Sequence, residues 1–232
     1  MKNFLLASSI LSADFSKLGE EICNVLDAGS DMIHFDVMDN HFVSNLTIGP
    51  LVLESLFKYK KIRYAKFDVH LMTSPVDDLV VKFAKLNVEV ISFHPESTTN
   101  VNETIKLIKN YNCKVGLVLN PFASLNILNK FIDKIDLILL MSVNPGFPGQ
   151  VFISSVLDKI RIVRNLINKS NRNILLEVDG GINKSNIFAI ANCGVDIFVI
   201  GSAIFNTINY VETIRCLRNE LKKVNFISRS VR

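Results

Sequence analysis

Residues 137–150 read LILLMSVNPGFPGQ, and this stretch carries the pattern on which the fold prediction depends. Its first five residues form a continuous apolar run, which is typical of a strand that is covered on both faces, as the strands of a parallel sheet are. Glycines and prolines follow at once and indicate a turn. The stretch therefore predicts a buried strand whose carboxyl end opens into a loop.

The same pattern of an apolar run followed by a polar or glycine-rich cluster recurs along the whole chain. Eight runs lie at residues 5–9, 32–37, 66–71, 88–94, 114–119, 137–142, 174–179 and 197–200. Amphipathic helical spacing is found between them at residues 17–26, 76–86, 101–111, 156–168 and 210–224. Ser74 and Pro75 resemble a helix cap followed by proline in the first turn. Eight strand–helix units predict an α/β fold, a (β/α)8 TIM barrel that forms one domain over residues 1–232, although a doubly wound open sheet has the same local pattern.

Composition and charge narrow the class of protein. With 49% hydrophobic and 21% charged residues, the chain favours a large buried core. Its longest apolar runs are far shorter than the roughly 18 residues of a membrane-spanning helix, and residues 1–15 read as the first strand rather than a signal peptide. The net charge of +4 is spread over 26 basic and 22 acidic residues. Neither a nucleic acid nor a membrane is therefore expected as a partner.

The spacing of the cysteines indicates the redox state of the cellular compartment. Four cysteines are scattered along the chain without a CxxC pair or zinc-finger spacing, which favours a reducing, cytoplasmic location. A homo-oligomer is compatible with the sequence, but the apolar helix faces are needed for the packing of the barrel and so give no evidence for an interface.

Histidines and aspartates lie at the carboxyl ends of three predicted strands. His34 and Asp36 are two residues apart on one strand, so both side chains project to the same side of the pleat. His70 ends the next strand and Asp179 ends the seventh. Since the carboxyl ends of barrel strands share one rim, closure brings these four side chains together. Two imidazoles and two carboxylates suit a divalent metal such as zinc, manganese, iron or cobalt.

The alternative is that each histidine is a hydrogen-bonded core residue and each aspartate caps a strand end. The joint placement favours the metal, because burying two carboxylates without a neutralising cation or proton is costly. Asp68 and Glu177 share the strand faces of His70 and Asp179, so they either support the ligands or fill the barrel interior. His94 precedes a proline and is expected only to shape the rim.

Two carboxylates on opposite sides of a substrate suit inversion at a carbon. One aspartate removes a proton next to a carbonyl, a metal stabilises the resulting charge, and the other aspartate returns a proton from the opposite face. Asp36 and Asp179 are the candidates for these two roles.

Three glycine-containing loops predict a site for phosphate. After the last three strands the chain reads VNPGFPGQ at residues 143–150, DGGI at 179–182 and GSAIF at 201–205. Glycines let backbone N–H groups approach an anion, and a short helix that begins near Ser202 would point its positive end inward. Met38, Met72 and Met141 lie near strand ends, where core packing and the lining of a substrate cavity are equally expected.

The segments SSILSADF, HFDVMDNHFV, FDVHLM, MSVNPGFPGQ, EVDGGI and GSAIF resemble, in order and spacing, the motifs of the ribulose-phosphate 3-epimerase family. The resemblance covers nearly the whole chain and implies a barrel of the ribulose-phosphate-binding type. It also implies metal ligation by His34, Asp36, His70 and Asp179, with the two aspartates as proton acceptor and donor. The implied substrate contacts are Ser9, Met38, His70, Met72, Met141, Gly146, Phe147, Pro148, Gly149, Asp179, Gly180, Gly181, Gly201 and Ser202.

The implied reaction interconverts D-ribulose 5-phosphate and D-xylulose 5-phosphate, a step of the pentose phosphate pathway. Two residues depart from the family pattern, since Pro148 and Asn40 stand where the family usually has glycine. Proline has no N–H, so the loop loses one potential phosphate donor.

Three other functions compete with this one. The nearest is a 3-epimerase of a six-carbon ketose phosphate such as allulose 6-phosphate, which would use the same four ligands. A decarboxylase or aldolase of the related phosphate-binding barrels is disfavoured, because those carry a DxKxxD motif and residues 36–39 read DVMD. A non-catalytic metal- or metabolite-binding barrel is disfavoured by the complete ligand set.

Overall fold

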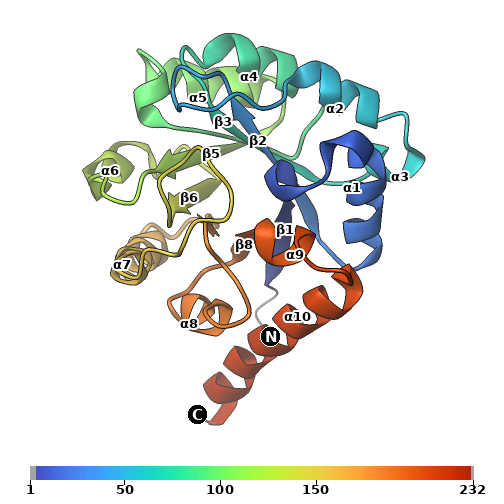
Figure 1. Ribbon diagram of the computed structural model, residues 1–232. Helices are drawn as coiled ribbons and strands as arrows, with labels where there is room; N and C mark the ends of the chain where they lie inside the picture. Colours follow the sequence, from blue (N-terminus) through green and yellow to red (C-terminus); the bar gives the residue numbers. More distant parts are fainter. Residues whose placement is uncertain (1–3, 231–232) are drawn as a thin grey trace.

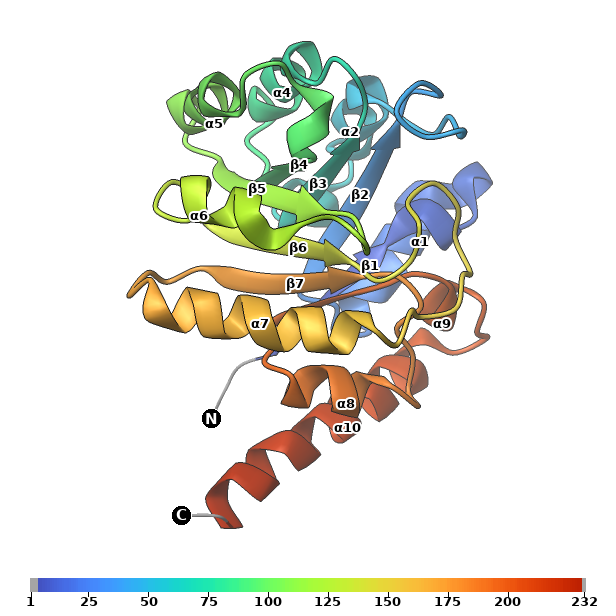
Figure 2. The ribbon, with the colours of Figure 1, turned by 90° about the vertical axis from the view of Figure 1, so that its left-hand side faces the viewer.

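Eight parallel strands form a closed barrel in the order β1 to β8, as the sequence predicts (Figure 1). The computed structural model describes residues 4–230. The strands are β1 (Leu5–Ser9), β2 (Met32–Met38), β3 (Phe67–Met72), β4 (Val90–Phe93), β5 (Lys114–Leu119), β6 (Leu137–Met141), β7 (Leu175–Asp179) and β8 (Ile197–Ile200). In the side view of Figure 2 the arrowheads of the strands point to one end, where the loop after β6 and helix α9 lie.

Helices surround the barrel on its outside (Figure 1). They are α1 (Leu18–Asp27), α2 (Pro50–Leu56), α3 (Lys60–Arg63), α4 (Asp77–Ala84), α5 (Val101–Asn110), α6 (Leu128–Phe131), α7 (Val156–Lys169), α8 (Ile187–Asn192), α9 (Ser202–Phe205) and α10 (Tyr210–Ser230). Within residues 4–230 no helix is both long and apolar enough to cross a bilayer.

The five helices predicted from spacing are present, and the predicted short helix at Ser202 is α9. Helices α2, α3, α6 and α8 were not predicted, because segments of four to seven residues are too short to display a helical period. The reading of Ser74 and Pro75 as the start of a helix is wrong. Their peptide bond is cis, and α4 begins only at Asp77, with Val76 as the residue before it.

Several helices end in a residue with left-handed backbone conformation. Asn87 follows α4, Asn112 follows α5 and Asn171 follows α7, with φ between 53° and 61°. Asparagine tolerates this conformation better than other residues with a β-carbon, and it redirects the chain toward the next strand. These asparagines are therefore part of what makes each helix return to the sheet.

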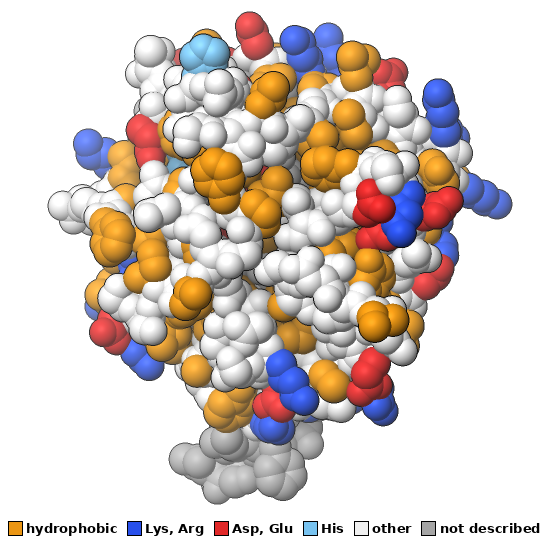
Figure 3. All heavy atoms as spheres, in the orientation of Figure 1, with side chains coloured by type: hydrophobic (Ala, Val, Ile, Leu, Met, Phe, Trp, Pro, Cys, Tyr) orange, Lys and Arg blue, Asp and Glu red, His pale blue; other side chains and the backbone are white. Residues whose placement is uncertain are grey.

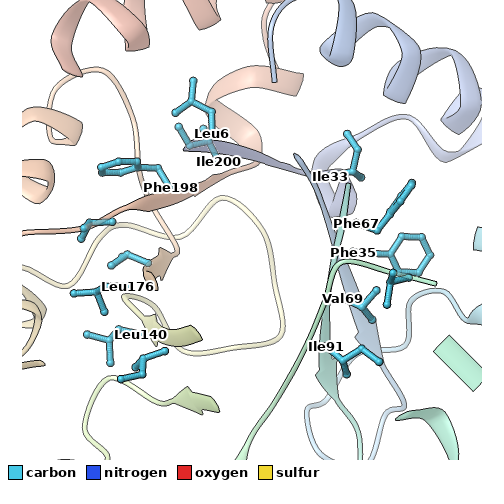
Figure 4. Packing of buried hydrophobic residues seen from close by; sticks show 14 of the residues in the cluster. Leu6, Ile33, Phe35, Phe67, Val69, Ile91, Leu140, Leu176, Phe198 and Ile200 are labelled. Atoms are coloured by element: carbon cyan, nitrogen blue, oxygen red, sulfur yellow. The ribbon is translucent and has the colours of Figure 1, made fainter. Parts of the chain in front are cut away.

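Alternate residues of each strand pack on opposite faces and so build two cores. Figure 4 shows outward-facing side chains such as Phe35, Phe67 and Leu176 in the layer between strands and helices. Rings of Phe35 and Phe67 meet edge to face with centroids 6.4 Å apart. A second, smaller cluster that includes Val118, Leu139 and other residues fills the inside of the barrel. The barrel is thus a packed core in which polar groups are the exception.

The strand register sets which polar groups meet inside. Asp36 lies opposite His70 and His34 opposite Asp68 in the β2–β3 pair. His70 in turn lies opposite Ser92 of β4, and Ser92 opposite Gly116 of β5. A continuous row of interior positions therefore runs from Asp36 across three neighbouring strands.

Gly116 is predicted to be required for this row. A β-carbon at Gly116 would lie 2.0 Å from Ser92 Oγ and 2.8 Å from Ser92 Cβ. Gly116→Ala should lower the free energy of unfolding by about 1–3 kcal/mol, the usual cost of overpacking a core, as measured by urea denaturation. The same substitution should cost less in a Ser92→Gly background, because the clash is then absent; equal costs in both backgrounds would contradict the proposed clash.

Candidate active site

Four predicted metal ligands converge at the carboxyl-terminal mouth of the barrel. Ligand atoms of His34, Asp36, His70 and Asp179 all lie within 4.8 Å of one another. His34, Asp36 and His70 come from the adjacent strands β2 and β3, whereas Asp179 approaches from β7 across the barrel. The structure therefore brings together residues up to 145 positions apart in the sequence.

Asp36 is the centre of this group. Its Oδ1 atom lies 3.3 Å from His34 Nε2 and 3.2 Å from His70 Nδ1, and Ser9 Oγ donates a hydrogen bond of 2.7 Å to Oδ2. Burial opposes the charged form of Asp36, but the charge of His34 and the close contacts with both histidines outweigh it and lower the pKa of Asp36 below its usual value. The surroundings of Asp36 therefore favour its ionised form.

Asp179 has the opposite protonation tendency. Burial, followed by the charge of nearby Asp36, raises the pKa of Asp179 to about 7. Its Oδ2 lies 4.0 Å from His34 Nε2, too far for a hydrogen bond. Two aspartates that border one site thus have pKa values displaced in opposite directions, which is a recurrent feature of acid–base pairs.

The Nδ1 atom of His34 lies close to two buried acidic side chains. It lies 2.6 Å from Asp68 Oδ2 and 4.0 Å from Glu177 Oε1. This contact fixes the ring so that Nε2 points toward Asp36 and Asp179. Burial raises the pKa of Glu177 well above its usual value, and the charge of Asp68 adds to the effect. Asp68 and Glu177 therefore lie inside the barrel beside His34. They are on the same strand faces as His70 and Asp179, as expected.

The four side chains fit a divalent cation. His34 Nε2 is buried and has no hydrogen-bond partner within the described residues. Burial disfavours a charge on His34, yet the charges of Asp36 and Asp68 hold the pKa of His34 well above its usual value. The cluster therefore attracts positive charge, and two nitrogen and two oxygen donors at this spacing could hold one metal ion.

A cavity opens beside the ligands and receives most of the predicted substrate contacts. Its predicted lining residues are Ser9, Asp36, Met38, Met141, Phe147, Pro148, Gly149, Asp179, Gly180, Gly181, Gly201 and Ser202. No lysine or arginine among the described residues lines it. Figure 3 shows this face of the molecule, on which charged side chains lie mainly toward the edge.

Three predicted contacts lie outside the cavity lining. Met72 is buried and packs with Met38 and Val43. Gly146 is also buried, and its carbonyl accepts a hydrogen bond of 2.6 Å from Asn45 Nδ2, which ties the loop after β2 to the loop after β6. His70 lies behind Asp36 in the ligand group.

Some residues of the cavity were not found from the sequence. They are Leu11, Ser12, Val143, Gln150, Ile182 and Val199. Gln150 Nε2 donates to the carbonyls of Asn144 and Phe147 and so shapes the loop after β6. Ser12 and Gln150 belong to the motifs SSILSADF and PGFPGQ, which was the available signal, but neither carries a charge or ring that marks it as functional.

Gly180 and Gly181 allow two loops to meet at the cavity. Their φ angles are +117° and +65°, which L-residues with a β-carbon rarely adopt. A β-carbon on Gly181 would lie 2.4 Å from the backbone nitrogen of Phe152. Glycine is therefore needed both for backbone conformation and for close approach of the loops after β6 and β7.

Comparison with solved structures supports the fold. KGPDC from Streptococcus mutans has a TM-score of 0.71 at 14% identity, over 96% of this chain and 99% of that one. For 3-hexulose-6-phosphate synthase from Salmonella typhimurium the TM-score is 0.66 at 14% identity, over 95% of this chain and 100% of that one. At such low identities the likeness concerns the barrel fold alone.

Comparison of sequences is more specific. Ribulose-phosphate 3-epimerase of Buchnera aphidicola subsp. Baizongia pistaciae is 70% identical over 225 residues, which are 97% of this chain and 99% of that protein. Ribulose-phosphate 3-epimerase of Escherichia coli strain K12 is 54% identical over 225 residues, with the same two coverages. A model described as the Ribulose-phosphate 3 epimerase family matches residues 5–205, which include all eight strands and all four candidate ligands. The chain belongs to the ribulose-phosphate 3-epimerase family.

Proposed function

We propose that this chain interconverts D-ribulose 5-phosphate and D-xylulose 5-phosphate by inverting the configuration at C3. The observation that carries the proposal is the placement of Asp36 and Asp179 on two separate strands of the barrel, β2 and β7, where both line one cavity. The names of the relatives favour this five-carbon substrate over a six-carbon ketose phosphate. The reaction is a step of the pentose phosphate pathway.

Each aspartate has one role in each direction of the reaction. Asp36 is ionised, and the Ser9 hydroxyl holds its Oδ2, so it accepts the C3 proton from one face. Asp179, with its raised pKa, holds a proton and donates it to the other face. In the reverse reaction the roles exchange, which restores the starting protonation of both groups.

We further propose that His34, Asp36, His70 and Asp179 hold one divalent ion, which is zinc, manganese, iron or cobalt. When bound, such an ion supplies several kcal/mol of stabilisation to negative charge that develops on substrate oxygens. The supporting observations are the buried, unpartnered Nε2 of His34 and the attraction of the cluster for positive charge.

We assign the substrate phosphate to the part of the cavity that is lined by the glycine-containing loops after β6, β7 and β8. Gly149, Gly181 and Gly201 line the cavity there, together with Ser202 at the start of α9. Because no cationic side chain of the described residues lines the cavity, the donors must be backbone N–H groups and hydroxyls. Met38 and Met141 form apolar parts of the wall beside the sugar.

A cytoplasmic location and a homo-oligomeric state remain predictions from the sequence. The four cysteines are free thiols, which suits a reducing compartment.

Isotope exchange tests the proposed reaction. In D2O the metal-loaded enzyme should convert ribulose 5-phosphate to xylulose 5-phosphate with deuterium at C3, as followed by NMR, and should act poorly on allulose 6-phosphate. Asp36→Asn and Asp179→Asn should each lower turnover by at least about 10²–10⁴-fold, because each removes a proton carrier.

Asp158→Asn is the matched control, since Asp158 lies on α7 with a side chain that is 82% exposed. It should leave turnover unchanged. Absence of exchange with either substrate would overturn the epimerase proposal, and turnover within roughly tenfold of wild type in either active-site variant would overturn its role in proton transfer.

Removal of the metal should abolish turnover, and adding back zinc, manganese, iron or cobalt one at a time should identify the ions that restore it. Because the ion binds the folded state, free metal at roughly 100 times its Kd should stabilise the protein by about 2.7 kcal/mol, seen as a higher Tm in calorimetry. Asp36→Asn should show no such rise. A metal-stripped wild-type enzyme with full turnover would contradict this part of the proposal.

Pro148→Gly should strengthen substrate binding. The substitution restores an N–H group at the cavity wall, and one hydrogen bond worth about 0.5–1.5 kcal/mol corresponds to a KM that is about two- to tenfold lower with kcat similar. Pro145→Gly, in the same loop but outside the cavity lining, controls for added flexibility and should not lower KM. An unchanged or higher KM for Pro148→Gly would show that the loop does not use an N–H at this position.

A further inference from the structure

His94 contacts a candidate metal ligand but has no part in the proposed reaction. It follows β4, is fully buried and lies outside the cavity lining. Its Nε2 atom is 3.0 Å from Nε2 of His70, and the two ring planes are inclined by 26° with centroids 5.1 Å apart. A contact this short between two ring nitrogens requires one donor and one acceptor.

The direction of this hydrogen bond follows from the other nitrogen of His70. Nδ1 of His70 faces the ligand group, 3.2 Å from Asp36 Oδ1. When Nδ1 binds a metal it carries no proton, so the single proton of neutral His70 must be on Nε2. His70 Nε2–H then donates to His94 Nε2, and the proton of neutral His94 is on its Nδ1.

The carboxylate of Glu96 lies near the Nδ1 atom of His94. His94 Nδ1 has no hydrogen-bond partner within the described residues and lies 3.7 Å from Glu96 Oε1. The same Glu96 oxygen accepts a hydrogen bond of 2.7 Å from Asn120 Nδ2. Lys159 Nζ of α7 donates to the Asn120 carbonyl at 2.7 Å and to those of Pro121 and Ala123. The support for His70 therefore extends to the outer helices.

Packing holds His94 in this orientation. The Phe42 ring lies against it with centroids 4.7 Å apart. The His94 carbonyl accepts hydrogen bonds from Ser97 N at 3.0 Å and Ser97 Oγ at 2.7 Å. Neither the ring nor the backbone of His94 is free to turn away from His70.

We propose that His94 is a positioning residue that fixes His70 in the tautomer presenting Nδ1 to the metal. The inference rests on the metal site of the proposed function. It gives the two histidine ligands parallel supports through different nitrogens: Asp68 holds Nδ1 of His34 so that Nε2 faces the metal, and His94 holds Nε2 of His70 so that Nδ1 does.

Zinc affinity tests the proposal, with Kd measured by competition against a chromophoric chelator. His94→Phe keeps an aromatic ring at this position but removes the nitrogen that accepts the hydrogen bond from His70. It should weaken zinc binding by about 10–100-fold. His94→Gln should lose less, because its amide oxygen can accept from His70 Nε2–H. His41→Phe is the matched control at an exposed histidine and should bind zinc as wild type does.

A second measurement needs no variant. In zinc-loaded wild-type protein with ¹⁵N-labelled histidine, NMR should find the proton of His70 on Nε2 and that of His94 on Nδ1. The reverse tautomers would overturn the proposal, as would zinc affinity of His94→Phe within roughly twofold of wild type, well short of the expected loss. If wild-type protein itself fails to bind zinc, or binds it no better than Asp36→Asn, the metal site of the proposed function fails and this inference with it.

Discussion

The pairing of β2 with β3 is the constraint on which the site depends. In this register Asp36 lies opposite His70 and His34 opposite Asp68, so two histidine–carboxylate contacts form between direct neighbours. Side chains alternate along a strand, and a slip of one residue would turn every one of these groups toward the helices. Phe35, fully buried on the outer face against Phe67 and Phe83, prevents the slip because it cannot move inside without emptying that layer.

Several acidic groups lie close together inside the barrel, and their pKa values are shifted in different directions. Asp36 has a lowered pKa because two histidines contact it, whereas burial and neighbouring charge raise the pKa of Asp179 and Glu177. Ionising all of them together would cost too much in a medium of low polarity. The same crowding that attracts a cation therefore also shifts the pKa values of the two aspartates in opposite directions, as the proposed proton acceptor and donor require.

Much of the fold and the ligand group could be predicted from sequence, because both follow from periodicity and from strand ends that share a rim. His34 and Asp36 are on one strand face by spacing alone. The proposed role of His94 could not be predicted, since its contact with His70 depends on the register of β4 against β3 and on the turn at Pro95. Helices such as α2 and α6 were missed because they have at most two turns, and tertiary packing rather than periodicity stabilises them.

Among the described residues no lysine or arginine lines the cavity, although Asp36 and Asp179 do. In the proposed function, a cationic side chain there would add to the positive charge that the metal ion already places beside Asp179, and so would further favour the ionised form of Asp179. Backbone N–H groups and the Ser202 hydroxyl can bind an anion without placing a full positive charge near this carboxyl. The glycines at 149, 180 and 181, with their left-handed backbone, thus do more than form turns. In the proposed function they let backbone N–H groups hold the substrate phosphate without a cationic side chain close to Asp179.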